Sequence, residues 1–388
     1  MNLESIIFDL GVIIIVATVL GTLFLYAKQP IIIAYIAIGI VAGPSGFGLI
    51  QTTDHIEQIS HLGVILLLFL IGLNLQPERL IGLFKETSLL TLFTSFSFGI
   101  VSVLFGSLIG FDLNSALIFG AAMMFSSTVI GLKLIPTTTL HHKRTGEIMT
   151  SVLLLQDILA ILVILFITGD SSNNVWVTFI VLIAKLAVLC LLAFLGVRFV
   201  MTPLLQKFDV IQEYTFVATL AWCLLWAEVA YVLGLSYELG AFVAGISIGS
   251  CIVARSIAEH LKPLREFFLI LFFFAVGASL HFNLDIKLLI AAILFGAILV
   301  PFKALLFRFA FKRAGESEKL STELAARLAQ SSEFSLLIVF SALSMGVLSG
   351  DSAMVIQIAT IVSFIISTYW VVLKHPTTIA VDSALHQD

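Results

Sequence analysis

Long apolar runs follow one another along this chain, separated by short breaks of polar residues, glycine or proline. A run of about 20 apolar residues is long enough to cross a bilayer as a helix. The pattern predicts an all-α polytopic membrane protein with thirteen transmembrane helices. Their approximate limits are 5–26, 30–50, 60–75, 87–110, 114–135, 147–168, 175–199, 213–234, 236–254, 262–282, 285–311, 321–347 and 351–373.

The basic residues predict how these helices are oriented. With the N-terminus outside, fifteen of the sixteen basic residues in loops or at helix ends fall on the cytoplasmic side, and only Lys287 falls outside. Cytoplasmic loops of membrane proteins carry such an excess of lysine and arginine. We therefore expect the N-terminus outside and the C-terminus in the cytoplasm.

Composition narrows the class of function. The chain is 60% hydrophobic and only 11% charged, whereas soluble domains average about 25% charged residues. The net charge of −4 gives no argument for a nucleic-acid partner. The partner that the hydrophobic composition indicates is the lipid bilayer. The sequence contains no HExxH motif and no pair of catalytic acids, so we do not expect an enzyme.

Three sequence matches indicate an internal repeat. FLIGLNL (69–75) resembles FAVGASL (274–280) at an offset of 205, FSSTV lines up with QSSEF at the same offset, and two VAG triplets match at 202. Matched spans differ by seven crossings, an odd number, so the repeats must be inverted across the membrane. Inverted repeats are typical of secondary transporters. We expect one domain over 1–388, with repeat one at about 5–168, a linker helix at about 175–199, repeat two at about 213–373, and a short cytoplasmic tail at 374–388.

The fifth and twelfth spans carry polar clusters, Ser126-Ser127-Thr128 and Gln330-Ser331-Ser332-Glu333. Hydroxyls that bond back to their own helix would explain either cluster alone. Because both clusters occupy the same place in the two repeats, we instead expect both helices to be broken there. Broken helices free backbone carbonyls and helix ends at a buried ion site. The predicted supporting residues of the ion path are Ser126, Ser127, Thr128, Ser331 and Ser332.

Asp157 lies near the middle of the sixth span. A charged side chain at the centre of a membrane helix costs about 2.5–3.5 kcal/mol. One interpretation is a salt bridge with Lys303 or Arg327 that fixes helix packing, but a buried ion pair offsets little beyond its own desolvation. The functional interpretation is an exchangeable site, because burial disfavours the ionised carboxylate and a bound cation favours it. Competition of a proton and a cation for Asp157 would couple their fluxes.

The neighbouring polar residues refine this hypothesis. Gln156 offers a carbonyl ligand but no second titratable proton, so one acid at the site predicts electroneutral exchange of one monovalent cation for one proton. Lys303 lies deep in the eleventh span, where we expect an internal acidic partner. Arg327 and Glu333 are expected to stabilise the crossover of the twelfth span or to pair with each other.

The chain resembles the monovalent cation:proton antiporter-2 family, and most closely its glutathione-gated potassium efflux (Kef) branch. The resemblance covers about residues 5–373, and the Gln-Asp pair of the Kef proteins is matched by Gln156-Asp157. The motifs that carry it, in order, are GPSGFGLI, LGVILLLFLIGLNLQPERL, SSTVIGLKL, VLLLQDILAIL, LGAFVAG, PLREFFLILFFFAVGASLHF and LAQSSEFSLLIV.

The resemblance implies a sodium/proton antiporter-like fold, a homodimer and an elevator-type mechanism. The mobile core would comprise spans 4–6 and 11–13, with spans 5 and 12 crossing as broken helices. Carried to matching positions, the family roles make Asp157 the carrier of ion and proton, with Gln156 as its neighbour. They place Ser126, Ser127 and Thr128 beside the ion path, Lys303 as the basic residue of the core, and Glu333 and Arg327 as supports of the crossover.

One departure from the family is large. Kef proteins usually continue into a cytoplasmic nucleotide-binding domain, and this sequence contains no GxGxxG after a strand. We therefore expect the transmembrane domain without a C-terminal nucleotide-binding domain, and no cofactor. Either a missing domain or a separate cytoplasmic regulatory subunit would supply regulation. Gating by glutathione or nucleotide is not carried over.

The sequence thus predicts an electroneutral potassium:proton antiporter of the bacterial inner membrane. A sodium:proton antiporter with the same site is the alternative, because Asp and Gln oxygens do not choose between the two ions by type. A cation channel and a non-transporting membrane sensor are more remote alternatives. A channel would not need Asp157 to bind protons, and a sensor would keep its function in Asp157→Asn.

Overall fold

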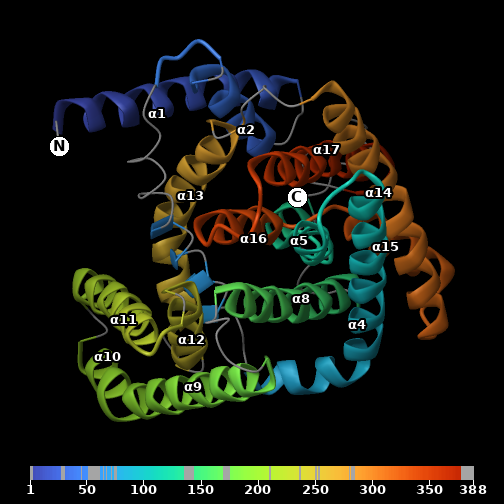
Figure 1. Cartoon of the computed structure of the whole chain (residues 1–388). Helices are drawn as coiled ribbons and strands as arrows, with labels where there is room; N and C mark the ends of the chain where they lie inside the picture. The colour runs from blue at the N-terminus through green and yellow to red at the C-terminus, as the bar shows by residue number, and fades with distance from the viewer. Residues whose placement is uncertain are drawn as a thin grey trace. The chain divides into compact units, whose positions relative to one another are not determined.

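The computed structural model describes residues 3–27, 31–44, 46–50, 62–63, 65–66, 68–70, 72–73, 77–134, 144–168, 175–208, 211–235, 237–249, 251, 254–278, 280 and 285–376. Within these residues every regular element is a helix (Figure 1). The helices are α1 (Leu3–Tyr26), α2 (Ile31–Ala42), α4 (Pro77–Leu108), α5 (Leu113–Met123), α6 (Thr128–Lys133), α8 (Arg144–Thr168), α9 (Val175–Gly196), the π-helix η1 (Val197–Met201), α10 (Thr202–Phe208), α11 (Gln212–Val232), α12 (Tyr237–Gly249), α13 (Ala254–Ala278), α14 (Ile286–Arg313), α15 (Glu318–Arg327), α16 (Glu333–Ser344) and α17 (Gly350–Lys374).

The predicted helical class is confirmed, and most predicted spans coincide with helices to within a few residues. The larger differences include three boundaries: α2 ends at Ala42, eight residues before the predicted end, α4 begins at Pro77, ten residues before the predicted start, and α13 begins at Ala254, eight residues before the predicted start. In the described part of the chain, seven helices are long and apolar enough to cross a membrane, and shorter apolar helices accompany them. The count of thirteen spans stays a prediction. Residues 377–388 of the predicted tail lie outside the described residues.

The chain divides into two compact units. The first contains Met1–Asp9, Ile50–Ile81 and Leu165–Ala275, and within it α12 packs against α11 and α9. The second contains Leu10–Leu49, Gly82–Ile164 and Val276–Asp388. Within the second unit α14 packs against α17 and α15, and α16 packs against α17 and α5 (Figure 1). All of the predicted site residues belong to this second unit.

Two helices of the second unit are broken where the sequence predicted it. The fifth span forms α5 and α6, separated at residues 124–127, and the twelfth forms α15 and α16, separated at residues 328–332. Each second half starts at a serine cap: Ser127 Oγ accepts the N–H of Ile130, and Ser332 Oγ accepts the N–H of Phe334. Serine side chains favour such positions because they satisfy the unpaired N–H groups of a new helix.

The structure repeats at the offset found in the sequence. Asp112 caps α5 and Ser317 caps α15, while Ser127 caps α6 and Ser332 caps α16, and the members of each pair are 205 residues apart. The turns that precede α5 and α15 also correspond, since Gly110 and Gly315 both adopt a positive φ. The same local chemistry therefore starts and stops the helices in both halves.

The FLIGLNL and FAVGASL motifs contain corresponding close approaches of two backbones. A Cβ atom at Gly72 would lie 2.4 Å from the carbonyl oxygen of Phe242, and one at Gly277 would lie 2.1 Å from that of Ile36. No side chain fits at such distances, so each of these positions requires glycine. The repeated glycine therefore reflects repeated packing of helix against helix.

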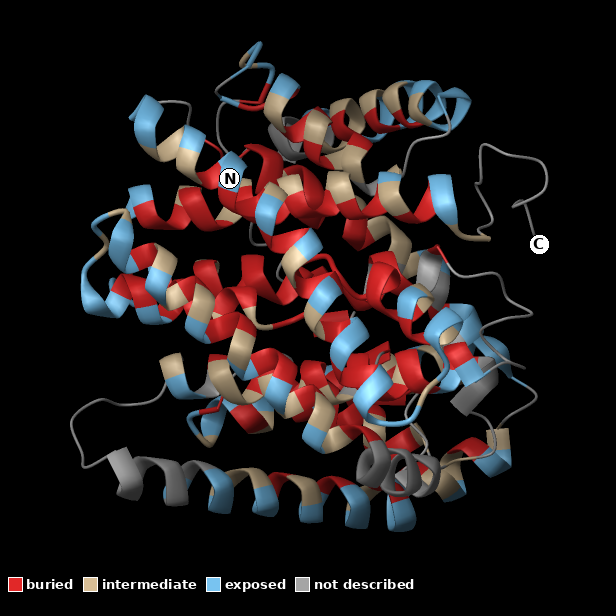
Figure 2. Ribbon diagram, turned by 90° about the vertical axis from the view of Figure 1, so that its right-hand side faces the viewer, coloured by how far each residue is buried: buried red, intermediate tan, exposed pale blue. Residues whose placement is uncertain are grey.

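Many large apolar residues of the long helices are exposed. Figure 2 shows exposed residues, in pale blue, recurring along these helices. On α1, for example, Ile15 and Val19 are more than half exposed, as are Leu89 and Ile100 on α4. Apolar faces of this kind would be costly in water, and they match the hydrocarbon of a bilayer. By contrast, every residue from Leu324 to Val339 is buried, which places the second break in the interior of its unit.

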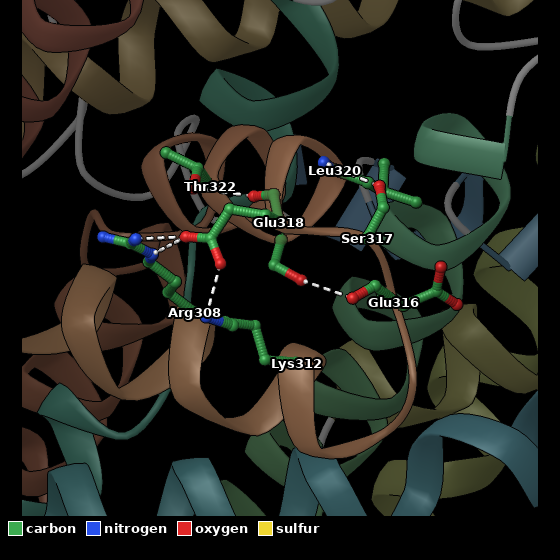
Figure 3. Close-up of polar contacts among 8 residues, drawn as sticks. Arg308, Lys312, Glu316, Ser317, Glu318, Leu320 and Thr322 are labelled. Carbon is green, nitrogen blue, oxygen red and sulfur yellow. Dashed lines mark hydrogen bonds and ion pairs between the residues drawn. The ribbon is translucent and has the colours of Figure 1, made fainter.

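Charged residues gather at the turn between α14 and α15. Glu318 forms ion pairs with Arg308 and Lys312, as Figure 3 shows. Hydrogen bonds from Lys312 and then Arg308 lower the pKa of the Glu318 carboxyl. Glu316 in the same turn accepts a bond of 3.1 Å from Arg144 at the start of α8. Exposed pairs contribute little stability singly, so we regard this cluster as fixing the turn without adding much to the free energy of unfolding.

Candidate ion-binding site

The first break leaves backbone groups without helical partners, and side chains from other helices take their place. The N–H of Ser126 donates to Oε1 of Gln156 on α8 at 3.0 Å. The carbonyl oxygen of Ser127 accepts from Nε2 of Gln330 at 3.3 Å. Buried backbone groups must find such partners because an unpaired one costs about 1–3 kcal/mol. The break is therefore a bonded structure and not a frayed helix.

The second break is held in the same way. The N–H of Ser331 donates to Oγ of Ser363 on α17 at 3.0 Å, and the carbonyl oxygen of Leu328 accepts from Oγ of Ser126 at 2.7 Å. The latter bond joins the two broken helices directly. A further bond of 2.6 Å joins them, from Oγ of Ser335 to the carbonyl oxygen of Ala122. The two helices thus cross at their breaks and are bonded to each other there.

Lys303 of α14 is completely buried between the two breaks. Its Nζ donates to the carbonyl oxygen of Phe125 at 2.6 Å and to that of Gln330 at 3.1 Å, and it lies 4.8 Å from the centroid of the Phe98 ring. Phe125 and Gln330 occupy corresponding positions of the two repeats. The prediction of an internal acidic partner for Lys303 was wrong. Its ammonium group instead binds carbonyl oxygens just beyond the C-terminal ends of α5 and α15, where the helix dipoles are negative.

Asp157 is 1% exposed on α8. Oγ1 of Thr128 lies 3.1 Å from Oδ1 and 3.0 Å from Oδ2 of this carboxyl group. A hydroxyl donates to an ionised carboxylate and accepts from a protonated one, so Thr128 serves both states. Within the described residues, Asp157 forms no ion pair with Lys303 or Arg327. The salt-bridge interpretation of Asp157 therefore has no support in the geometry.

Glu333 is a second buried carboxyl group of the site. It is the first residue of α16, and it is 2% exposed. The start of a helix carries a partial positive charge, which favours the ionised form of an acid placed there. Thr128 is likewise the first residue of α6 and faces Asp157. The positive ends of both half-helices thus meet carboxyl groups, and the negative ends meet Lys303.

Arg327 closes α15 from a buried position. Its guanidinium group pairs with Glu323 at 3.0 Å and donates to the carbonyl oxygens of Leu134 at 3.1 Å and of Pro376 at 2.7 Å. Leu134 follows the end of α6, and Pro376 follows α17. The predicted support of the crossover by Arg327 is consistent with these contacts. The predicted partner Glu333 is replaced by Glu323.

We expect Arg327→Lys to lower the free energy of unfolding by about 2 kcal/mol, because an ammonium group cannot reach Glu323 and both carbonyl groups at once. The loss should appear as a lower melting temperature of the detergent-solubilised protein. Arg313→Lys, at the exposed end of α14, is the matched control. An Arg327→Lys protein that melts with the wild type would contradict this account.

Of the five predicted hydroxyl residues, only Thr128 bonds to Asp157. Ser126, Ser127, Ser331 and Ser332 bond or cap the breaks. The sequence did not single out Ser95, Phe98, Ser335, Ser363 or Ser367, which lie within apolar helices and look like ordinary membrane-helix residues. Of these, Ser367 donates from its Oγ to Oε1 of Gln330 at 3.0 Å. Among the described residues, no group of three or more His, Cys, Asp or Glu could hold a metal ion.

Two broken helices that cross around a buried aspartate and a buried lysine, within an all-helical apolar chain, define the class of secondary transporters with discontinuous helices. The family model described as "Sodium/hydrogen exchanger, transmembrane" matches residues 12–374. The chain belongs to this family, and it is a multi-pass membrane protein.

Its relatives confirm the resemblance to potassium efflux antiporters. The chain is 30% identical to K(+) efflux antiporter 4 of Arabidopsis thaliana over 347 residues, which are 85% of this chain and 57% of the plant protein. It is 28% identical to K(+) efflux antiporter 6 of the same plant, covering 92% of this chain and 61% of that one. It is also 25% identical to the iron transporter MagA of Paramagnetospirillum magneticum, covering 93% of this chain and 83% of the relative.

A solved structure confirms the fold. The sodium proton antiporter MjNhaP1 of Methanocaldococcus jannaschii superposes with a TM-score of 0.73, over 96% of this chain and 97% of the other, at 17% identity. At this identity the likeness concerns the fold alone. The predicted sodium/proton antiporter-like architecture is thereby confirmed.

Proposed function

We propose that this protein exchanges one potassium ion for one proton, with Asp157 as the group that binds both. The observation that carries the proposal is a buried carboxyl group whose described hydrogen-bond partner is the neutral hydroxyl of Thr128. A carboxylate fixed by an ion pair would already be neutralised. Asp157 needs either a proton or a cation to be neutral, and this need makes the two compete.

Competition for one carboxylate is sufficient for coupling. Loaded with a proton or with a cation, Asp157 is electrically compensated, and the core can carry it across the apolar barrier. Empty and ionised, it would carry an uncompensated charge through a medium that disfavours it by several kcal/mol. The empty site therefore stays on its side of the barrier, which suppresses leak of either ion.

The second unit of the chain supports an elevator-type movement. It contains most of predicted spans 4–6 and 11–13, together with Leu10–Leu49 from spans 1 and 2, and hydrogen bonds join its two broken helices directly. In this proposal the second unit moves as a whole, in a homodimer, with the N-terminus outside and the C-terminus in the cytoplasm of a bacterial inner membrane. A cytoplasmic regulatory subunit or domain would act from that side.

Glu333 bears on the stoichiometry, because it is a second acid in the site. Its place at the start of α16 favours a constantly ionised carboxylate that neutralises the helix end. Asp157 is then the one group that exchanges its proton, and transport is electroneutral. Loss of exchange in Glu333→Gln with retention in Asp157→Asn would reverse these roles.

The choice of potassium as the transported ion rests on the relatives of this chain. Those at 28% and 30% identity are named potassium efflux antiporters, and the structural neighbour is a sodium proton antiporter. The side-chain oxygens of Asp157 and Thr128 suit either ion. Sodium:proton exchange through the same residues is therefore the second candidate.

Proton flux in proteoliposomes tests the function. A pH-sensitive dye inside the vesicles should report dissipation of an imposed proton gradient when potassium is added, at a lower half-saturating concentration than sodium. A potential-sensitive dye should stay unchanged in the same vesicles, because one charge leaves for each that enters. A response to sodium alone would correct the ion, and a membrane potential that develops during the exchange would refute one-for-one exchange.

A further inference from the structure

Gln156 uses both ends of its amide group within the protein. Its Oε1 accepts the N–H of Ser126 at 3.0 Å, and its Nε2 donates to Oγ of Ser95 on α4 at 3.1 Å. Gln156, Ser95 and Ser126 are all completely buried. The amide group therefore has one orientation, since the N–H of Ser126 requires an acceptor and the opposite end then presents a donor.

This orientation makes Gln156 a poor cation ligand. A backbone N–H dipole directs its positive end at Oε1 from 3.0 Å away, and a cation at the same oxygen would lie against that positive end. The NH₂ group at the other end repels a cation outright. By contrast, both oxygens of Asp157 face a hydroxyl that can turn its proton away from an arriving ion.

The same bond does fix the residues that meet the ion. Ser126 lies two residues before Thr128, and its hydroxyl donates to the carbonyl oxygen of Leu328 in the other broken helix. Holding the N–H of Ser126 therefore sets the position of Thr128 against Asp157 and the position of one broken helix against the other. Ser95 acts one step further back, because it accepts from Nε2 and thereby holds the amide group of Gln156 in place beside Ser126.

The second repeat contains a corresponding bond, although its long helix carries no acid at the position that corresponds to Asp157. Ser331 is related to Ser126 by the offset of 205, and its N–H is held by Oγ of Ser363 on α17. Residue 362, which that offset relates to Asp157, is a valine. A side chain of the following long helix thus holds this amide N–H in both repeats, whether or not that helix carries an acid at the position of Asp157.

We propose that Gln156 is a positioning residue that sets the broken helix against Asp157, and that Ser95 is a second positioning residue that acts through it. The inference rests on the proposed exchange at Asp157, and it assigns to Ser95 a role in transport. It also corrects the expectation that Gln156 offers its carbonyl oxygen to the ion.

A double-mutant cycle with Ser95→Ala and Gln156→Met tests the proposal in proteoliposomes. Gln156→Met keeps the length of the side chain and leaves the N–H of Ser126 unpaired, so the maximal rate should fall about tenfold or more. Ser95→Ala should lower it about threefold. In the Gln156→Met background Ser95→Ala should change nothing further, because the amide group it holds is gone. The ratio of potassium to sodium half-saturating concentrations should stay within about twofold of the wild type in all variants.

Ser102→Ala is the matched control, since Ser102 is completely buried on the same helix and donates to the carbonyl oxygen of Phe98 within that helix. Its rate should equal that of the wild type. Rate losses that multiply in the double variant would overturn the proposal. So would a Gln156→Met protein with the wild-type maximal rate, a weakened potassium affinity and a changed ion preference, which is the behaviour of a lost ligand.

Melting temperatures separate this inference from the proposed function. If the wild type exchanges neither potassium nor sodium for protons, the proposed function fails. The bonds of Gln156 still predict that Ser95→Ala and Gln156→Met lower the melting temperature non-additively. Additive losses of stability would refute the positioning role by themselves.

Discussion

Asp157→Asn is expected to abolish cation-driven proton flux, with a loss of about a hundredfold or more, the scale of removing a positioned proton-transfer group. Asparagine keeps the size of the side chain and can still bond with Thr128, but it neither binds a proton at physiological pH nor carries the charge that attracts a cation. The variant should be no less stable than the wild type, because it removes a buried charge. The measurement is dye-reported proton flux in proteoliposomes after addition of potassium or sodium.

Asp351→Asn is the matched control for this substitution. Asp351 lies in the exposed first turn of α17, and its variant should exchange ions at the wild-type rate. Exchange that persists in Asp157→Asn would show Asp157 to be structural, and the next group to test would be Glu333. Loss of exchange together with a lower melting temperature would point instead to a folding defect.

Lys303→Met is expected to lower the stability of the protein about as much as Arg327→Lys does. The ammonium group serves two buried carbonyl oxygens, those of Phe125 and Gln330. Each of them left unpaired costs about 1–3 kcal/mol. Removal of a buried charge offsets part of this loss, so we expect a net decrease of about 2 kcal/mol in the free energy of unfolding. Thermal unfolding in detergent would measure it.

Two further variants test why Lys303→Met loses stability. Lys303→Gln places two uncharged N–H donors near the same carbonyl groups, so it should recover part of the stability that Lys303→Met loses. Lys287→Met, at the exposed start of the same helix, should leave stability unchanged. If Lys303→Gln and Lys303→Met lose equally, hydrogen bonding to the breaks is not the role of Lys303, and its charge is.

The two helix breaks show how much of the candidate site could be predicted from the sequence. Hydroxyl-rich clusters at corresponding places of the repeats predicted both interruptions without any glycine or proline to mark them. The physical reason is that serine side chains can satisfy the unpaired N–H groups of a new helix, as Ser127 and Ser332 do at the two breaks. The clusters did not predict the separate roles of their residues. Thr128 bonds to Asp157, whereas the serines bond or cap the backbone at the breaks.

The partners of Lys303 and Gln156 were beyond sequence reasoning for a different reason. From a sequence, the partner of a buried lysine can be predicted only from charge complementarity. This reasoning predicted an acidic side chain as the partner of Lys303. The structure supplies carbonyl oxygens, which every residue has and which no composition can single out. Ser95 was missed likewise, because a serine in an apolar helix usually bonds to its own backbone.

The sequence by itself determined the helical class, the positions of most helices, the repeat and the places of both breaks, and it pointed to Asp157 as the acid of the candidate site. These follow from hydrophobic length and from local capping, which act within about one helical turn or along one helix. Only the tertiary structure decided which polar atoms meet: that Thr128 faces Asp157, that Lys303 joins two carbonyl groups from different repeats, and that Gln156 holds the backbone. Such pairings depend on how helices distant in the chain cross, and in an apolar interior each freed backbone group has to find its partner there.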